Sequence, residues 1–328
     1  MTCPCARSAV WAFKVEEPPP ETPLKARFAD AAKALFEIPG GPRVDFSQPP
    51  GEPALAAPDS VSWRVFKNPV ALFVGGVTAV ILELAEPRVR SGVWDHSSFR
   101  TDPLGRLKRT GLAAMVTVYG ARTVAEAMIA GVGRQHARVA GTTPGGAPYR
   151  ADEVELLDWV QATASFGFLG AYHALVSPLS PAERDRFYGE AAPAARLYGA
   201  LGAPASEAEW DAQLAAMLPK LERSEIVFEF LALMRGVKIA GPLSRLQHPL
   251  IRAAVGLVPE PVRDVLGLGR QWSPRRLELP VIRAAARIAD RTSIPGAPPY
   301  EASVRMGLPG DWLYRRSAEH GDWPASML

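Results

Sequence analysis

The sequence predicts an all-α fold, in which one large helical domain follows a proline-rich arm. From Trp63 onward, apolar residues recur at helical spacing, whereas runs of alternating β-branched residues are scarce. Several of these stretches begin with a residue that typically caps a helix. The 328 residues are 48% hydrophobic and 22% charged. This is an ordinary globular composition, and it is sufficient for a substantial core.

Residues 1–60 differ from the rest because prolines recur throughout them, three of them consecutive at 18–20. Proline lacks a backbone donor and is excluded from helix interiors. One short helix fits between the prolines, over residues 23–36, where apolar residues have helical spacing. We expect this segment to wrap the domain or to stay mobile. The chain then divides into an arm, a helical domain and a C-terminal tail at residues 1–60, 61–316 and 317–328.

Helices are expected in order along the domain, at residues 68–85, 102–119, 123–140, 152–176, 181–201, 207–218, 224–234, 249–258, 259–266 and 280–292. Asp152 is placed to cap the fourth of them. Ser180 precedes a proline and is followed three residues later by a glutamate, which is the pattern of a capping box, and Ser206 precedes acidic residues in the same way. The stretch around His96 is interpreted as a loop, and the glycine-rich residues 141–146 as a turn.

Charge and motifs exclude several function classes. The net charge of +3 comes without a dense Lys/Arg block, which argues against nucleic acid. The apolar runs are too short or too interrupted for a membrane span. The chain has no nucleophile elbow, phosphate-binding loop or dinucleotide fingerprint. No signal peptide is evident, and Cys3 and Cys5 provide no disulfide framework across the fold, so we expect a cytoplasmic protein.

Two positively charged residues and a hydroxyl share one helical face. Arg106, Arg109 and Thr110 are spaced i, i+3 and i+4, so their side chains point the same way. Small residues continue the stripe toward the end of the helix. Such a stripe either faces solvent or faces a polar ligand or cofactor.

The next helix carries His136 on a small, apolar face. Val132 and Gly133 share this face, and the glycine leaves space for a flat body to approach the backbone. A neutral imidazole is the usual proximal ligand of haem iron. On these residues alone, His136 is either a histidine that is hydrogen-bonded in the core or an iron ligand with Val132 and Gly133 beside the cofactor.

These features occur within an ordered series of motifs: Pro87-x-Val89-x-x-Gly92-Val93-x-x-His96-Ser97-x-Phe99-Arg100-x-Asp102-Pro103, Arg106-x-x-Arg109-Thr110, Gly120, His136-x-x-Val139-x-Gly141, Tyr149-x-Ala151-Asp152 and Leu156-Leu157-x-Trp159-Val160-x-Ala162-Thr163. The series resembles the haem-dependent oxygenase family of the latex-clearing protein and MpaB. The resemblance covers residues 63–292 and is strongest over 69–177.

The resemblance implies a globin-like helical core around haem b, with dioxygen as co-substrate. It implies that His136 is the proximal iron ligand and that Arg106 and Thr110 are catalytic on the distal side. Arg109 would share this role or pair with a haem propionate. In the latex-clearing protein a lysine at the position of Arg109 can cap the iron. Because a guanidinium has no lone pair to offer, that closed state is not expected here.

The resemblance leaves the catalytic base open. The family's acidic base lies upstream of the Arg–Thr pair, and Glu83, Glu86 and Asp95 are all candidates. For His96 we favour a structural or substrate-side role over a second metal site, since no paired ligand spacing supports one. His173 lies on an apolar helix and receives no chemical role.

The function expected from the sequence is oxidation of an apolar small molecule, such as an isoprenoid or another alkene, by a haem-dependent oxygenase. One alternative is a haem-binding carrier or sensor without oxygenase turnover. Another is a helical protein that keeps the fold but binds no haem. The sequence does not indicate the oligomeric state.

Overall fold

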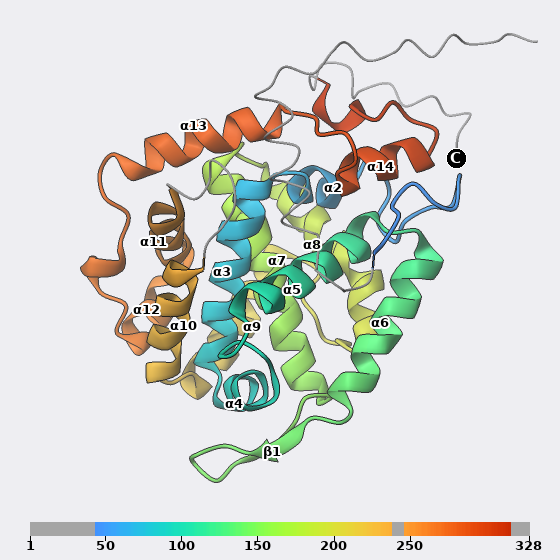
Figure 1. Ribbon diagram of the computed structural model, residues 1–328. Coiled ribbons are helices and arrows are strands. Elements are labelled where there is room, and N and C mark those ends of the chain that lie inside the picture. The colour runs from blue at the N-terminus through green and yellow to red at the C-terminus, as the bar shows by residue number, and fades with distance from the viewer. Residues whose placement is uncertain (1–42, 238–245, 316–328) are drawn as a thin grey trace, which may run out of the picture.

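The computed structural model describes residues 43–237 and 246–315, and within them the protein is all-α, as the sequence predicts (Figure 1). These residues form thirteen α-helices. Their bounds are α2 Val61–Phe66, α3 Pro69–Ala85, α4 Pro87–His96, α5 Pro103–Tyr119, α6 Arg122–His136, α7 Val154–Leu175, α8 Pro181–Tyr198, α9 Glu207–Met217, α10 Glu225–Gly236, α11 Gln247–Leu257, α12 Glu260–Leu266, α13 Glu278–Asp290 and α14 Pro298–Arg305. A two-stranded antiparallel hairpin joins α6 to α7, with strands β1 Ala140–Thr142 and β2 Pro148–Arg150.

Helix α3 runs through the middle of the domain and packs closely on α7 (Figure 1). The two backbones meet at glycines, because a Cβ atom on Gly75 would lie only 2.7 Å from the Gly167 carbonyl oxygen. The Trp159 indole also donates to the Leu82 carbonyl at 3.2 Å. Within the described residues no single helix has the length and apolarity to cross a membrane. Helices α3 and α4 have sufficient length and apolarity only when they are taken together, and a bend of 111° separates them.

The capping signals are confirmed for two helices and are wrong for one. The Ser180 hydroxyl and the Glu183 carboxylate form the expected capping box of α8, and the Ser206 hydroxyl accepts from the Glu209 amide at 3.2 Å. Helix α7 instead has Glu153 as its N-cap, without a side-chain cap. The Asp152 carboxylate is turned away because it binds the Arg150 guanidinium at 2.9 Å.

The stretch interpreted as a loop around His96 is helical up to His96, where α4 ends, and is non-helical over residues 97–102. Pro87 occupies the first turn, and the Glu86 carboxylate accepts from the Val89 amide at 2.7 Å. Proline suits this position because the first helical amides have no intrahelical partner. Helix α6 ends at His136, although the sequence predicts a helix up to residue 140, and the first strand of the hairpin begins at Ala140.

The described end of the proline-rich segment packs on the domain through the buried side chain of Arg305. Its guanidinium donates to the carbonyls of Phe46 at 2.6 Å, Glu52 at 2.9 Å and Tyr119 at 2.7 Å. Three features expected from the sequence, the two cysteines, the helix over 23–36 and the tail from 317, lie outside the described residues. The division into arm, domain and tail stays a prediction.

Candidate active site

The structure places Arg106 and Thr110 side by side on α5. The Arg106 guanidinium donates to the Thr110 hydroxyl, and this hydroxyl donates to the Arg106 carbonyl at 3.0 Å. The guanidinium also lies over the Phe99 ring, 5.4 Å from its centroid. Phe99 in turn meets Phe230 edge to face at 5.6 Å. The Phe99 ring, itself packed on Phe230, therefore supports the cation, and the cation holds the hydroxyl.

Arg109 lies at the exposed beginning of the same helix. Its guanidinium binds the Ser98 hydroxyl and pairs with the Asp102 carboxylate at 3.4 Å. Asp102 is also the N-cap of α5, accepting from the Gly105 amide at 2.9 Å. Burial is the main cause that lowers the pKa of Arg106. The negative charge of Glu83 raises this pKa, and the positive charge of Arg109 lowers it further.

Glu83 on α3 is the candidate base that lies next to Arg106. Burial raises the pKa of its carboxyl to about 7, and the positive charge of Arg106 acts in the opposite direction. The carboxyl makes no hydrogen bond within the described residues. Its side chain is half-buried. A carboxyl of this kind can exchange a proton near neutral pH.

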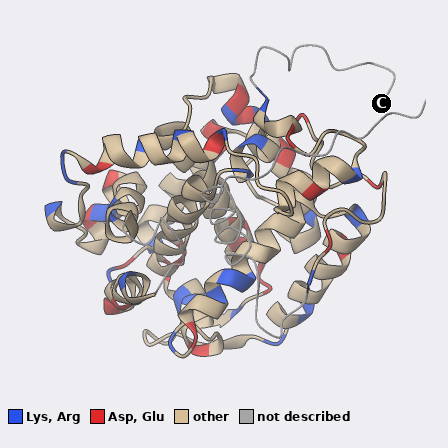
Figure 2. Ribbon diagram, turned by 45° about the horizontal axis from the view of Figure 1, so that its top comes forward, with Lys and Arg blue, Asp and Glu red and all other residues tan. Residues whose placement is uncertain are grey.

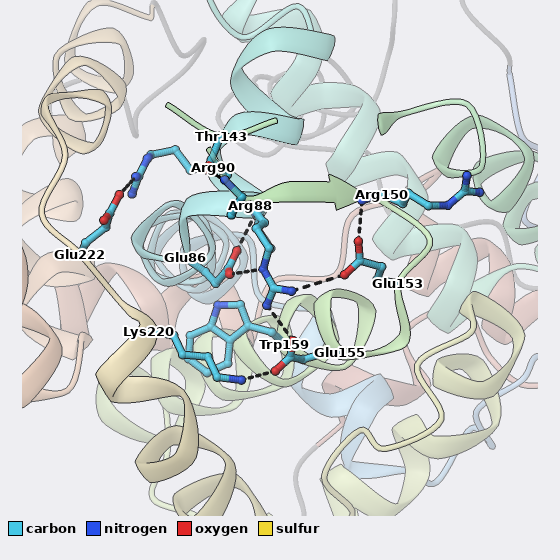
Figure 3. Close-up of polar contacts among 12 residues, drawn as sticks. Glu86, Arg88, Arg90, Thr143, Arg150, Glu153, Glu155, Trp159, Lys220 and Glu222 are labelled. Atoms are coloured by element: carbon cyan, nitrogen blue, oxygen red, sulfur yellow. Dashed lines mark hydrogen bonds and ion pairs between the residues drawn. The ribbon is translucent and has the colours of Figure 1, made fainter. Parts of the chain in front are cut away.

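Glu86 belongs to a separate network of charges (Figure 3). Its carboxylate, which is nearly fully buried, binds the Arg88 guanidinium at 2.8 Å. Arg88 also pairs with Glu153 at 3.3 Å and Glu155 at 2.7 Å. The network fastens the beginning of α4 to the beginning of α7, which is a structural role. The third candidate, Asp95, is exposed near the end of α4.

His136 ends helix α6 with a half-buried imidazole. Its Nδ1 atom is buried and has no hydrogen-bond partner among the described residues. Burial lowers the pKa of the ring, the positive charge of Arg106 lowers it further, and Asp152 partly offsets both. The imidazole is therefore neutral near pH 7, which is the form that binds metal ions.

Open space lies beside both helices of the site. A Cβ atom built on Gly133, one turn before His136, would meet nothing within 4 Å, and the same is true of Gly111, which follows Thr110. Val132 is half-buried next to Gly133. The neutral imidazole, its partnerless nitrogen and the space at Gly133 fit a flat cofactor held by one histidine, as in many haem proteins.

The other histidines of this region have different surroundings. His96 is exposed, and its ring meets the Tyr149 ring edge-on at 6.4 Å. The His173 Nδ1 atom accepts from the Leu179 amide at 2.9 Å, which fixes the end of α7. Within the described residues, no group of three or more His, Cys, Asp or Glu side chains could hold a bare metal ion.

A pocket of about 560 Å³ lies between the beginning of α5 and α10. Its lining is largely apolar and comes from Thr101, Asp102, Pro103, Leu104, Glu229, Ala232, Leu233, Gly236 and Val237. Sequence reasoning missed this pocket because it forms where two helices distant in the sequence meet. Helical periodicity alone does not show which helices are neighbours.

The comparison with protein families matches residues 63–291 to the family described as ER-bound oxygenase mpaB/B'/Rubber oxygenase, catalytic domain. No curated protein and no solved structure matches the chain. The matched stretch is well over half of the sequence, and it includes Glu83, Arg106, Thr110 and His136. The chain therefore belongs to the mpaB/rubber oxygenase catalytic-domain family.

Proposed function

We propose that the protein is a haem b-dependent oxygenase that uses dioxygen to oxidise an apolar small molecule, such as an isoprenoid or another alkene. Membership of an oxygenase family supports the general reaction class. The observation that carries the haem assignment is His136, a neutral imidazole with a buried, partnerless nitrogen beside open space at Gly133. We also propose a cytoplasmic location. The two cysteines are separated by a single residue and cannot form a disulfide framework across the fold, which suits a reducing compartment.

In this proposal His136 would hold the haem iron, and Val132 and Gly133 would border the cofactor. When bound, haem supplies the redox-active iron on which dioxygen chemistry depends. Arg106 keeps a positive charge and several N–H donors at the side of the site where negative charge develops. Its hydrogen bond to Thr110 fixes the position of that hydroxyl.

Glu83 is the proposed acid–base group. Its pKa of about 7 means that the protonated and ionised forms coexist at neutral pH, so the carboxyl can both accept and return a proton. Arg106 opposes the effect of burial and keeps the ionised form accessible. Positioned groups of this kind contribute about 10²–10⁴-fold to a rate.

The pocket between α5 and α10 is the proposed binding region for the substrate. Its lining includes Leu104, which belongs to the same helix as Arg106, and its volume lies within the range of about 300–1,000 Å³ that is usual for small-molecule sites. Leu233 and Val237 offer apolar surface. Asp102 and Glu229 line the same pocket, and each pairs with an arginine, Arg109 at 3.4 Å and Arg100 at 3.7 Å.

Replacing His136 with alanine tests the haem assignment. The purified variant should lose most of its bound haem, measured by the Soret band, while its helical circular dichroism is unchanged. His96→Ala is the matched control and should stay red, because His96 is exposed at the end of α4. Full haem retention in His136→Ala would refute the assignment.

Oxygenase turnover needs a second measurement. Ferrous wild-type protein should consume dioxygen faster when an apolar alkene is present than when it is absent. Haem binding without this acceleration would instead indicate a carrier or a sensor. The Leu233→Trp variant, which fills the pocket, should raise KM for the alkene and leave the haem content unchanged.

A further inference from the structure

Helix α13 carries apolar side chains on two opposite faces. Ile282 and Ala286 are fully buried and pack into the domain. The opposite face is exposed and forms what we call the outer stripe, which consists of Leu277, Val281, Ala284 and Ile288. Leu277 is 76% exposed, Val281 51% and Ile288 64%. At about 100° per residue the four positions fall within about 60° of the helix circumference, so they form one continuous surface.

Arginines accompany the outer stripe. They precede α13, continue along one flank of it and follow its end, and all are exposed: Arg275, Arg276, Arg283, Arg287 and Arg291. Figure 2 shows the basic positions recurring along α13 and in the loop before it. None of the five forms an ion pair within the described residues.

The two carboxylates of α13 form ion pairs with residues of other helices or loops. Glu278 pairs with Arg252, with a hydrogen bond of 2.8 Å from the Arg252 Nε atom, and both side chains are largely buried. Asp290 pairs with the buried Lys67 at 3.3 Å. Arg283 and Arg287 also donate to backbone carbonyls at the end of α7, at 3.1 and 3.4 Å, and the charge of Arg275 helps to lower the pKa of Glu278. Arg276 and Arg291 make no side-chain hydrogen bond or ion pair within the described residues, so the exposed side of α13 is both apolar and positive.

We infer that the outer stripe and its arginines dock the protein on the surface of an anionic lipid bilayer, with α13 lying in the plane of the interface. An exposed apolar stripe beside a row of cations is the pattern of an interfacial helix. The apolar side chains enter the acyl boundary, and the guanidinium groups meet lipid phosphates. This inference does not depend on the proposed haem chemistry.

A second copy of the chain fits this face less well. A two-fold dimer brings the same patch of both copies together, so the arginine rows of the two copies would be concentrated at one interface. Like charges brought together in this way oppose association. A nucleic acid would use the arginines but would leave the apolar stripe in water.

Vesicle flotation of the full chain tests the inference. Wild-type protein should float with vesicles of phosphatidylcholine containing phosphatidylglycerol, should float weakly with phosphatidylcholine alone, and should lose binding as salt is raised. The triple variant Leu277→Ser/Val281→Ser/Ile288→Ser should reduce partitioning about tenfold or more. The Arg276→Gln/Arg291→Gln variant should reduce it by a similar factor on anionic vesicles.

A matched control uses apolar residues exposed elsewhere. Leu197 and Leu201 are 46% and 68% exposed at and beyond the end of α8, and replacing both with serine should leave flotation unchanged. All substituted side chains are exposed, so thermal unfolding should be nearly the same in every variant. Three outcomes would each overturn the inference: no flotation of the wild type, equal loss in the control, or a wild-type dimer that the triple variant converts to a monomer.

Discussion

Replacing Glu83 with glutamine is expected to stabilise the haem-free protein at pH 8. Burial raises the pKa of this carboxyl from 4.5 to about 7 in the folded state. The folded protein therefore binds the proton more tightly than the unfolded chain. The resulting stability is fully present below the unfolded pKa and is lost as the pH rises through about 7. The loss is about 3 kcal/mol, since one pKa unit corresponds to about 1.4 kcal/mol. Glutamine cannot ionise and avoids this loss.

Urea unfolding at pH 5 and at pH 8 measures the effect. The free energy of unfolding of Glu83→Gln relative to wild type should increase by about 2–3 kcal/mol between the two pH values. Glu126→Gln, at an exposed position on α6, is the control and should stay within about 0.5 kcal/mol of wild type at both. If the difference between Glu83→Gln and wild type is the same at pH 5 and pH 8, Glu83 titrates normally and is not the acid–base group.

Three further predictions concern the haem site. Arg106→Ala and Thr110→Ala should keep the haem spectrum and slow turnover about 10²–10³-fold, and unchanged turnover in both would show that the pair is structural. Gly133→Leu should weaken haem binding, measured by titration, without lowering apoprotein stability, because its side chain would enter open space; undiminished affinity would place the cofactor elsewhere. The ferric protein should be high-spin in electron paramagnetic resonance, since Arg109 cannot coordinate iron. A low-spin, nitrogen-ligated spectrum that is unchanged in Arg109→Ala would show that another residue caps the metal.

Much of the fold could be predicted because the long helices carry their signals locally. Helical periodicity and the capping box at Ser180 identify α7 and α8 with small errors at their ends. The short helices α2, α4 and α14 were missed because each has at most ten residues; α4 and α14 begin with proline, as the longer and correctly predicted α8 does. A proline marks a helix start as well as a break, and in short segments few periodic positions remain to decide between the two.

The site could be predicted only where it depends on local geometry. Arg106 and Thr110 meet because residues four apart share a helical face, and this follows from spacing alone. The choice of Glu83 over Glu86 and Asp95 depends on which of them the charge of Arg106 reaches, and this is an electrostatic interaction between α3 and α5. Because α3 is buried on most sides, its periodicity does not show which side faces that helix.

The positive charge of Arg106 lowers the pKa of both Glu83 and His136, but it works against burial at Glu83 and with burial at His136. Removing the charge should therefore raise both pKa values, which makes Glu83 more protonated. Arg106→Ala should shift the limb of the pH–rate profile that reports Glu83 to higher pH, whereas Arg106→Lys, which keeps the charge but not the guanidinium geometry, should slow turnover with little shift. Equal shifts in the two variants would mean that the charge of Arg106 does not set the pKa of Glu83.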